Sequence, residues 1–192
     1  MKSIRFITLS VSILLLASCS GFLDLDGKDF YLDETGEVYF SSVVSLEKFT
    51  RNVVGCGWKC VDFRDIKDDG SLATKNESLK DGWGPSDYYF GESTVTSYFD
   101  DMTRPARCYY TYSYIFDDST IRTGSNNDIR LLKLSDGKFT CVSQIGWKYT
   151  GKNKNPIPHY MYFKYKKMTD KELQDYRDKY TTDFESLLNK GE

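Results

Sequence analysis

Alternating polar and apolar positions run through the middle of the chain and predict a set of β-strands. The clearest stretch is residues 107–116, where every second residue is apolar or aromatic: Cys108, Tyr110, Tyr112, Tyr114 and Phe116. Side chains two positions apart share one face of a strand, so this stretch presents an aromatic face. Alternation, or a high content of Tyr, Thr and Val, predicts six further strands, at residues 58–66, 86–90, 93–99, 128–134, 139–149 and 159–167.

Two segments with apolar residues three or four positions apart predict helices, one on each side of these strands. The first is short and can be capped by Ser45; Gly55 ends it, and its apolar positions are Leu46, Phe49 and Val53. The second begins at Thr169, which has capping-box spacing with Glu172. Its apolar positions continue toward the end of the chain: Leu173, Tyr176, Tyr180, Phe184 and Leu187.

Short turn sequences rich in Asp and Gly separate several of the predicted strands, for example at residues 67–70 and 135–137. No helical pattern separates the central strands, which argues against a parallel α/β sheet. We therefore predict a mainly β domain. Its strands form an antiparallel meander, as a barrel or a sandwich, with a short N-terminal helix and a longer C-terminal helix.

Residues 1–18 have the pattern of a secretion signal. Lys2 and Arg5 come before an apolar run at residues 6–17, and small residues follow just before Cys19. The run is about a dozen residues long, shorter than the roughly 20 that a membrane-spanning helix needs. The pattern therefore predicts an exported protein whose leader is removed.

The four residues Leu16-Ala17-Ser18-Cys19 resemble the lipobox of bacterial lipoproteins. This resemblance implies cleavage before Cys19, followed by acylation of its sulfur and of the new amino terminus. Several acyl chains would hold the protein stably on a membrane. Ser20 resembles the residue that directs such lipoproteins to the outer membrane. Whether the protein then faces the periplasm or the cell surface stays open.

Residues 19–42 predict a lipidated tether, because acidic residues are scattered there among Gly and aromatic residues. Part of this tether can dock on the domain through Phe30, Tyr31 and Tyr39. We expect the domain itself to span residues 43–192.

The order of the predicted elements resembles that of the lipocalin-like barrels: a short helix, a strand meander and a closing helix. The sequence Gly55-Cys56-Gly57-Trp58 at the start of the first strand is part of this resemblance. The chain is similar in build to small lipocalin-like lipoproteins of gut Bacteroidetes. The resemblance covers about residues 45–185 and implies an antiparallel barrel. A shared fold does not by itself imply a ligand.

Four cysteines remain after the leader: Cys56, Cys60, Cys108 and Cys141. Disulfides form readily in exported proteins, and four cysteines allow three connectivities. Cys56 and Cys60 would lie about 13 Å apart on one strand, too far to bridge each other, which favours pairing with Cys108 and Cys141. Buried thiols are the alternative, and the spacing is loose for a four-cysteine zinc site.

The charge and the scarcity of histidine limit the chemistry. A formal net charge of −2 provides no basic surface for nucleic acid. His159 is the only histidine, and its surroundings in the sequence identify no nucleophile and carboxylate for a catalytic triad. The adjacent aspartates at 68–69, 100–101 and 117–118 are typical of turns. We therefore expect a non-catalytic protein without a metal ion or cofactor.

Aromatic residues on the predicted strands are the candidates for contact with a ligand: Trp58, Tyr110, Tyr112, Tyr114 and Trp147. Such rings can stack on a sugar or line an apolar pocket, or they can simply pack within a half-buried strand. The first case predicts a membrane-anchored binding module for a small apolar or glycan-like ligand. The second predicts a structural or interaction subunit of an envelope complex, whose protein partner the sequence does not identify.

Overall fold

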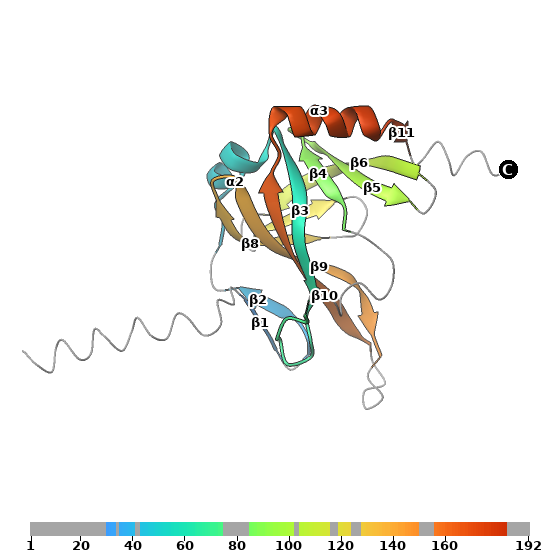
Figure 1. Cartoon of the computed structure of the whole chain (residues 1–192). Coiled ribbons are helices and arrows are strands. Elements are labelled where there is room, and N and C mark those ends of the chain that lie inside the picture. Colours follow the sequence, from blue (N-terminus) through green and yellow to red (C-terminus); the bar gives the residue numbers. More distant parts are fainter. Residues whose placement is uncertain are drawn as a thin grey trace, which may run out of the picture.

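The fold is a closed, eight-stranded antiparallel barrel (Figure 1). We describe it from a computed structural model, which describes residues 30–33, 35–40, 43–74, 85–101, 104–115, 119–123, 128–149 and 156–183. The barrel strands are β3 (Cys56–Asp65), β4 (Asp87–Phe90), β5 (Thr94–Asp101), β6 (Arg104–Ile115), β7 (Thr120–Thr123), β8 (Ile129–Ser135), β9 (Lys138–Lys148) and β10 (Ile157–Lys167).

Each barrel strand pairs with the next strand in the chain, and β10 returns to pair with β3. The predicted mainly β meander barrel is therefore confirmed. The strand missing from the prediction is β7, which has only four residues and pairs with β6 over Tyr112–Ile115. So short a strand gives little alternation in the sequence, yet it is the strand that joins β6 to β8 and closes the barrel.

Helix α2 (Leu46–Val53) precedes the first barrel strand and inserts its apolar side into the barrel. The Ser45 hydroxyl accepts a hydrogen bond from the Lys48 amide at 3.2 Å, so the predicted cap is confirmed. Phe49 and Val53 are buried, whereas Leu46 is half exposed. The helix ends just before Gly55, whose φ of +77° is a left-handed conformation that glycine adopts without strain.

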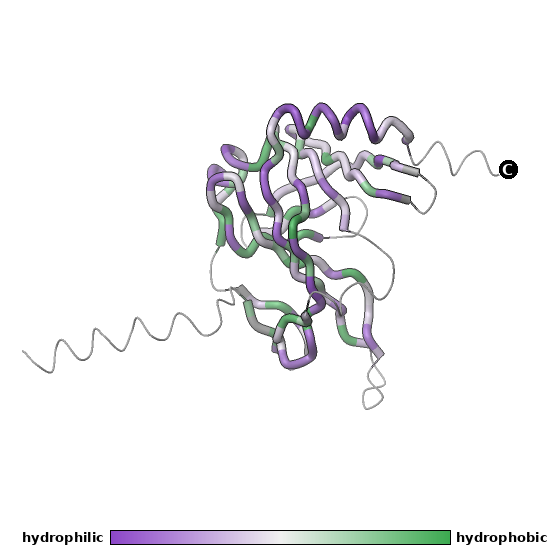
Figure 2. Tube along the Cα trace, viewed as in Figure 1, coloured by the Kyte–Doolittle hydropathy of each residue, from purple (hydrophilic) through white to green (hydrophobic). Residues whose placement is uncertain are grey.

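Helix α3 (Asp170–Lys179) lies along the outside of β3, β4 and β5, across the top of Figure 1. Its capping box, between Thr169 and Glu172, is formed as predicted. The phenol of Tyr176 donates a hydrogen bond to Asp87 at 2.7 Å, which ties the helix to β4. Figure 2 shows that α3 is mostly hydrophilic, so its outer face meets water.

The expectation that this helix continues through Leu187 is wrong. The helix stops at Lys179, and Thr182–Asp183 form β11, which pairs with β6 in parallel. Arg107 binds Asp183 at 2.7 Å and holds the segment in this extended form. Phe184 and Leu187 lie outside the described residues.

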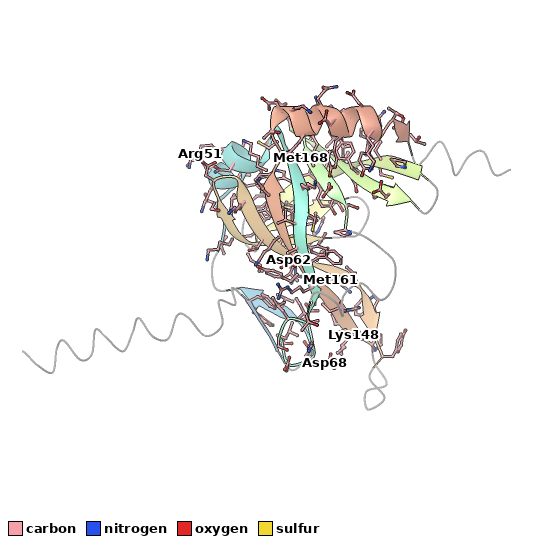
Figure 3. The ribbon with its side chains drawn as sticks, in the orientation of Figure 1. Arg51, Asp62, Asp68, Lys148, Met161 and Met168 are labelled. Carbon is pink, nitrogen blue, oxygen red and sulfur yellow. The ribbon has the colours of Figure 1, made fainter. Side chains whose placement is uncertain are left out.

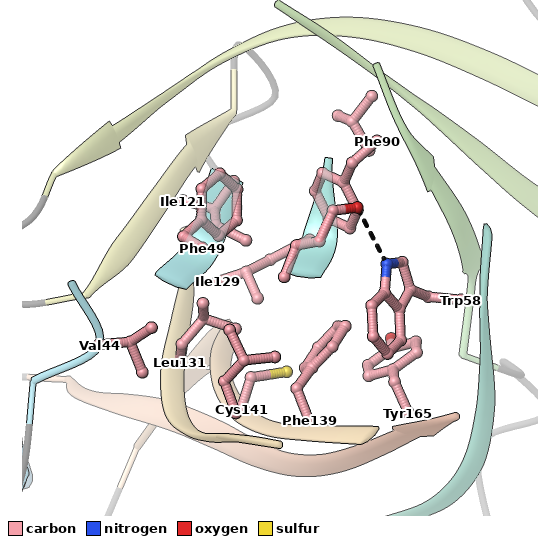
Figure 4. Close-up of a cluster of buried hydrophobic side chains, with 13 residues drawn as sticks. Val44, Phe49, Trp58, Phe90, Ile121, Ile129, Leu131, Phe139, Cys141 and Tyr165 are labelled. Atoms are coloured by element: carbon pink, nitrogen blue, oxygen red, sulfur yellow. Dashed lines mark hydrogen bonds between the residues drawn. The ribbon is translucent and has the colours of Figure 1, made fainter. Parts of the chain in front are cut away.

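The barrel core fills the interior beside α2 (Figure 4). Among the described residues it consists of thirteen buried side chains: Val44, Phe49, Val53, Trp58, Phe90, Val95, Ile121, Ile129, Leu131, Leu134, Phe139, Cys141 and Tyr165. Val44 precedes α2, and the other twelve come from α2 and from seven of the eight barrel strands, so inward-facing residues of many elements form one cluster.

A second hydrophobic cluster lies outside the barrel, under a hairpin formed by β1 (Phe30–Leu32) and β2 (Val38–Phe40). We call it the outer cluster, and its buried members are Phe30, Val38, Ile66, Leu132, Val142, Tyr160 and Tyr162. The hairpin falls within the segment expected to be a tether. Phe30 is buried there, as its predicted docking requires, whereas Tyr39 is exposed.

The predicted disulfides do not form: the four cysteines of the barrel are thiols in the structure. Two of them are on β3, one is on β6 and one is on β9, and none of these strands neighbours another in the sheet. Strands two places apart are separated by about 10 Å, whereas a disulfide needs Cα atoms within about 7 Å. The meander topology thus keeps the cysteines apart.

Neither α2 nor α3, the helices of the described residues, is long and apolar enough to cross a lipid bilayer. The expected leader, residues 1–18, and the expected lipidation site, Cys19, lie outside the described residues.

Candidate functional site

Four of the five residues expected to contact a ligand face the interior of the barrel. The Trp58 side chain is fully buried, packs edge-on against Phe139 with ring centroids 4.7 Å apart, and donates its indole hydrogen to the Val53 carbonyl (Figure 4). Tyr110, Tyr112 and Tyr114 are half-buried and pack against the barrel core. The tyrosine stripe is therefore part of the packing.

Helix α2 occupies the space that these tyrosines face. The ring of Phe49 stacks on Tyr114 with centroids 4.2 Å apart and meets Tyr112 edge-on at 6.2 Å. The hydroxyl of Tyr114 donates to the Val44 carbonyl, and that of Tyr112 donates to the Gly91 carbonyl. Both phenols thus have partners within the chain, and a ligand at this place would have to displace α2.

Polar groups in the barrel core or packed against it are held in their neutral forms. Burial raises the pKa of the phenols of Tyr88 and Tyr165, and also that of the Cys141 thiol. A thiol acts as a nucleophile only when it is deprotonated. Cys141 therefore behaves as a packing residue.

Trp147, the fifth candidate, lies away from the barrel core on the far part of β9. Its side chain is 59% exposed, and it sits opposite Pro158 of β10. Pairing with β8 ends at Ser143, so Trp147 belongs to a part of the β9–β10 hairpin that extends past the barrel. The structure separates this residue from the other four.

A cavity of about 170 Å³ lies near the same end, between the turn of the β1–β2 hairpin and the ends of β3, β9 and β10. We call it the hairpin pocket. Its apolar lining includes Leu32, Ile66, Ile157 and Pro158, and its charged and polar lining includes Asp33, Lys67, Asp68, Lys148 and Tyr160.

Lys148 connects two sides of the hairpin pocket. Its ammonium donates to the Ile66 carbonyl at 3.0 Å and lies 3.5 Å from the carboxylate of Asp68 (Figure 3). Asp68 is well exposed, so one of its oxygens can take a further hydrogen bond from a ligand. The pocket therefore offers both a cation and an anion beside an apolar wall.

The hairpin turn forms the opposite wall. Asp33 accepts hydrogen bonds from the amides of Thr35 and Glu37, at 2.8 and 3.0 Å, and so fixes the turn. The phenol of Tyr160 donates to Glu37 at 2.9 Å. Burial, and then this hydrogen bond to a carboxylate, raise the pKa of Tyr160 to about 12. Hydrogen bonds thus hold the turn against Tyr160, and Tyr160 stays protonated at neutral pH.

His159 pairs with Asp65, with 3.1 Å between the imidazole nitrogen and the carboxylate. Burial and then the charge of Lys148 lower the pKa of this histidine, and Asp65 partly opposes them. The charged groups that act on His159 are Lys148, Asp65 and Asp68, none of which is a hydroxyl or thiol nucleophile. The pair is a hydrogen-bonded contact between β10 and β3.

The adjacent aspartates mostly serve turns and ion pairs. Asp69 accepts from the Ser71 amide at 2.7 Å, and Asp100 binds Lys179 at 3.1 Å. The pair at 117–118 lies outside the described residues. Within the described ranges, no group of three or more His, Cys, Asp or Glu side chains is arranged to hold a metal ion.

Reading the sequence did not identify the hairpin pocket, because its lining comes from four separate segments of the chain. One signal was present: residues 30–32 and 38–40 read Phe-Tyr-Leu and Val-Tyr-Phe on either side of Asp33-Glu34-Thr35-Gly36-Glu37. Such a sequence is typical of a short hairpin, and Gly36 has the positive φ that its turn requires.

Comparisons of the chain with protein-family models, with curated proteins and with solved structures found no match.

Proposed function

We propose that this chain is a lipid-anchored, non-catalytic binding module of a bacterial cell envelope, with its ligand site in the hairpin pocket. The observation that carries this proposal is the position of the cavity. The hollow of about 170 Å³ lies outside the barrel, whereas Phe49 and the barrel core occupy the interior beside α2.

The ligand that fits the hairpin pocket best is one ring of a glycan. The cavity is smaller than the roughly 300 Å³ at which sites for drug-sized ligands begin, so it suits a single ring better than a long chain. Ile157 and Pro158 can contact the apolar face of a sugar. Asp68 and Lys148 can bind hydroxyl groups at its edge.

Saturation-transfer NMR with glucose, galactose, mannose and N-acetylglucosamine tests this proposal on the full-length lipoprotein in detergent. We expect at least one sugar to bind, and Asp68→Asn to weaken its binding about tenfold, because a hydrogen bond to a charged group is lost. Asp136→Asn is the matched control, since Asp136 is an exposed turn residue outside the pocket. Equal affinity in both variants would remove the ligand from this pocket.

Anchorage rests on the resemblance of residues 16–19 to a lipobox. We propose that Cys19 carries acyl chains and that the protein is held on the outer membrane. Labelling cells with a clickable palmitate analogue should mark the wild-type chain and leave Cys19→Ser unmarked. If Cys19→Ser stays labelled or stays with the membrane fraction, another feature supplies the anchorage.

The second candidate function is that of a structural or interaction subunit of an envelope complex with no small ligand. The filled barrel interior favours it. The side chains packed beside α2 stabilise the fold and leave no room there for a ligand. Native mass spectrometry of the full-length lipoprotein from its own membranes separates the two candidates. A retained small molecule supports the binding module. A protein retained in fixed stoichiometry, with no small molecule and no sugar bound, supports the subunit.

A further inference from the structure

We infer that the far end of the β9–β10 hairpin docks on the surface of a phospholipid membrane through Ile145, Trp147 and Tyr149. This inference rests on the lipid anchor of the proposed function and adds to it an orientation of the barrel. We call these three residues the β9 stripe. Their side chains are 47%, 59% and 79% exposed, and they occupy every second position.

The β9 stripe is exposed because β9 runs past the barrel. Pairing of β9 with β8 ends at Ser143, whereas its pairing with β10 continues to Lys148. Phe139 and Cys141, earlier on the strand, are buried in the barrel core. An irregularity in the pairing near His159 and Tyr160 separates the buried part of the strand from the exposed part.

Three large apolar side chains exposed together at one end of a strand are typical of an interaction site. Trp and Tyr are the residues that settle at the boundary between lipid and water, because each joins an apolar ring to a polar group. Among the described residues that line the hairpin pocket, Lys67 and Lys148 balance Asp33 and Asp68 in charge. The β9 stripe itself is apolar and aromatic, which fits a zwitterionic lipid surface.

The start of the domain lies toward the same end of the molecule. Figure 1 places β1 and β2 together with the far ends of β9 and β10, away from α3. The hairpin turn packs on β10: a side chain added at Gly36 would come within 3.5 Å of Ile157, which pairs with the neighbour of Trp147. The turn of the hairpin thus lies beside the strand that carries the β9 stripe, and Phe30, where the tether joins the domain, lies three residues before that turn on β1.

The length of the tether keeps this end close to the bilayer. Ten residues separate Cys19 from Phe30, so even a fully extended tether reaches only about 40 Å. A short tether gives the β9 stripe a high effective concentration at the membrane surface. The hydrophilic helix α3 lies at the other end and would face water (Figure 2).

Quenching of tryptophan fluorescence by brominated lipid tests the inference. The full-length lipoprotein, purified from its membranes, is reconstituted into phosphatidylcholine vesicles with and without dibrominated phosphatidylcholine. The measurement is made in a Trp83→Phe background, where the only other indole is that of the fully buried Trp58. We expect strong quenching in this background and its loss when Trp147→Phe is added. A matched control adds Tyr109→Trp to Trp147→Phe. This puts an indole at an exposed site on β6, where we expect no quenching.

In the Trp83→Phe background, equal quenching with and without Trp147→Phe would overturn the inference, as would equal quenching of the indole at position 109. If Trp147 is shielded only in native membranes and never in pure lipid, the stripe binds a protein and the lipid proposal is wrong. The mass of the N-terminal peptide is measured on the same sample. A Cys19 without acyl mass would remove the proposed anchor and the docking together, whereas an acylated chain with unquenched Trp147 would remove the docking alone.

Discussion

Phe49 of α2 lies face to face with Tyr114 of β6, with ring centroids 4.2 Å apart and ring planes within 2° of parallel. This contact joins the helix before the barrel to a strand in the middle of the meander. Phe49 also meets the ring of Phe90 on β4 at 6.4 Å, so one side chain packs against two separate strands of the wall. The mouth of the barrel is thereby filled by the chain itself.

Phe49→Ala should destabilise the fold by about 3–5 kcal/mol, because it removes a buried ring from a site that three neighbouring rings hold open. Urea unfolding followed by circular dichroism measures this change. Leu46→Ala, on the exposed side of the same helix, is the control and should cost under about 0.5 kcal/mol. Similar small effects for both would mean that α2 does not pack inside the barrel.

Phe30→Ala should also destabilise the domain, by about 3 kcal/mol, since Phe30 is buried in the outer cluster with Tyr162. Tyr39→Ala on the same hairpin serves as the comparison and should have a much smaller effect, because Tyr39 is 46% exposed. Thermal unfolding of both variants decides the matter. If Phe30→Ala leaves the unfolding temperature unchanged, residues 30–40 do not stabilise the domain and belong to the tether.

Gly57→Ala should loosen α3. A Cβ at this position would lie 2.9 Å from the ends of Leu173 and Met168, which is closer than real contacts allow, although both side chains are flexible. We expect a loss of about 1–3 kcal/mol in the free energy of unfolding, partly restored by adding Leu173→Ala. Gly146→Ala should be tolerated, since a Cβ there meets nothing within 4 Å.

The four barrel cysteines should all react as thiols. Alkylation of the unfolded, unreduced protein should add four labels to Cys56, Cys60, Cys108 and Cys141, and prior reduction should not change that number. In the folded protein Cys141 should react slowest, because it is buried and burial raises its pKa. A label count that rises after reduction would show a disulfide and contradict the strand order.

His159 should titrate below its ordinary pKa of 6.5, chiefly because of burial and then because of Lys148. Since it is the only histidine, its NMR signal can be followed through a pH titration of the untagged chain. Lys148→Met should raise the pKa, and Asp65→Asn should lower it further. Shifts in the same direction for both variants would contradict the observed geometry.

The same shift predicts how stability depends on pH. A depressed pKa means that the unfolded chain binds the proton more tightly than the folded chain does. The contribution of His159 is therefore fully present above pH 6.5 and is lost as the pH falls through the lower, folded value. The difference in unfolding free energy between the wild type and His159→Gln should shrink over that range. A difference that does not vary with pH would contradict the prediction.

Local patterns in the sequence determined most of the strands, the helix caps and the mainly β, antiparallel class; the choice of a barrel over a sandwich came from the resemblance to lipocalin-like proteins. Seven of the eight barrel strands are visible as alternation or β-rich composition, and both capping residues, Ser45 and Thr169, are placed correctly. These features depend on neighbours within a few residues, which a sequence displays directly. The leader and Cys19 belong to the same kind of local signal, and lipidation there remains a prediction.

Only the tertiary structure decided what the aromatic residues face and where the cavity lies. The alternation of Tyr112 and Tyr114 on one strand is the same whether they line a ligand pocket or pack in a core. The insertion of Phe49 is what makes them part of the core. Trp147 continues the alternation of a strand whose first half is buried, and it is exposed because β8 ends earlier than β9. The cysteines stay apart because of the strand order. Each of these outcomes depends on residues distant in the chain, and periodicity within a segment carries no information about them.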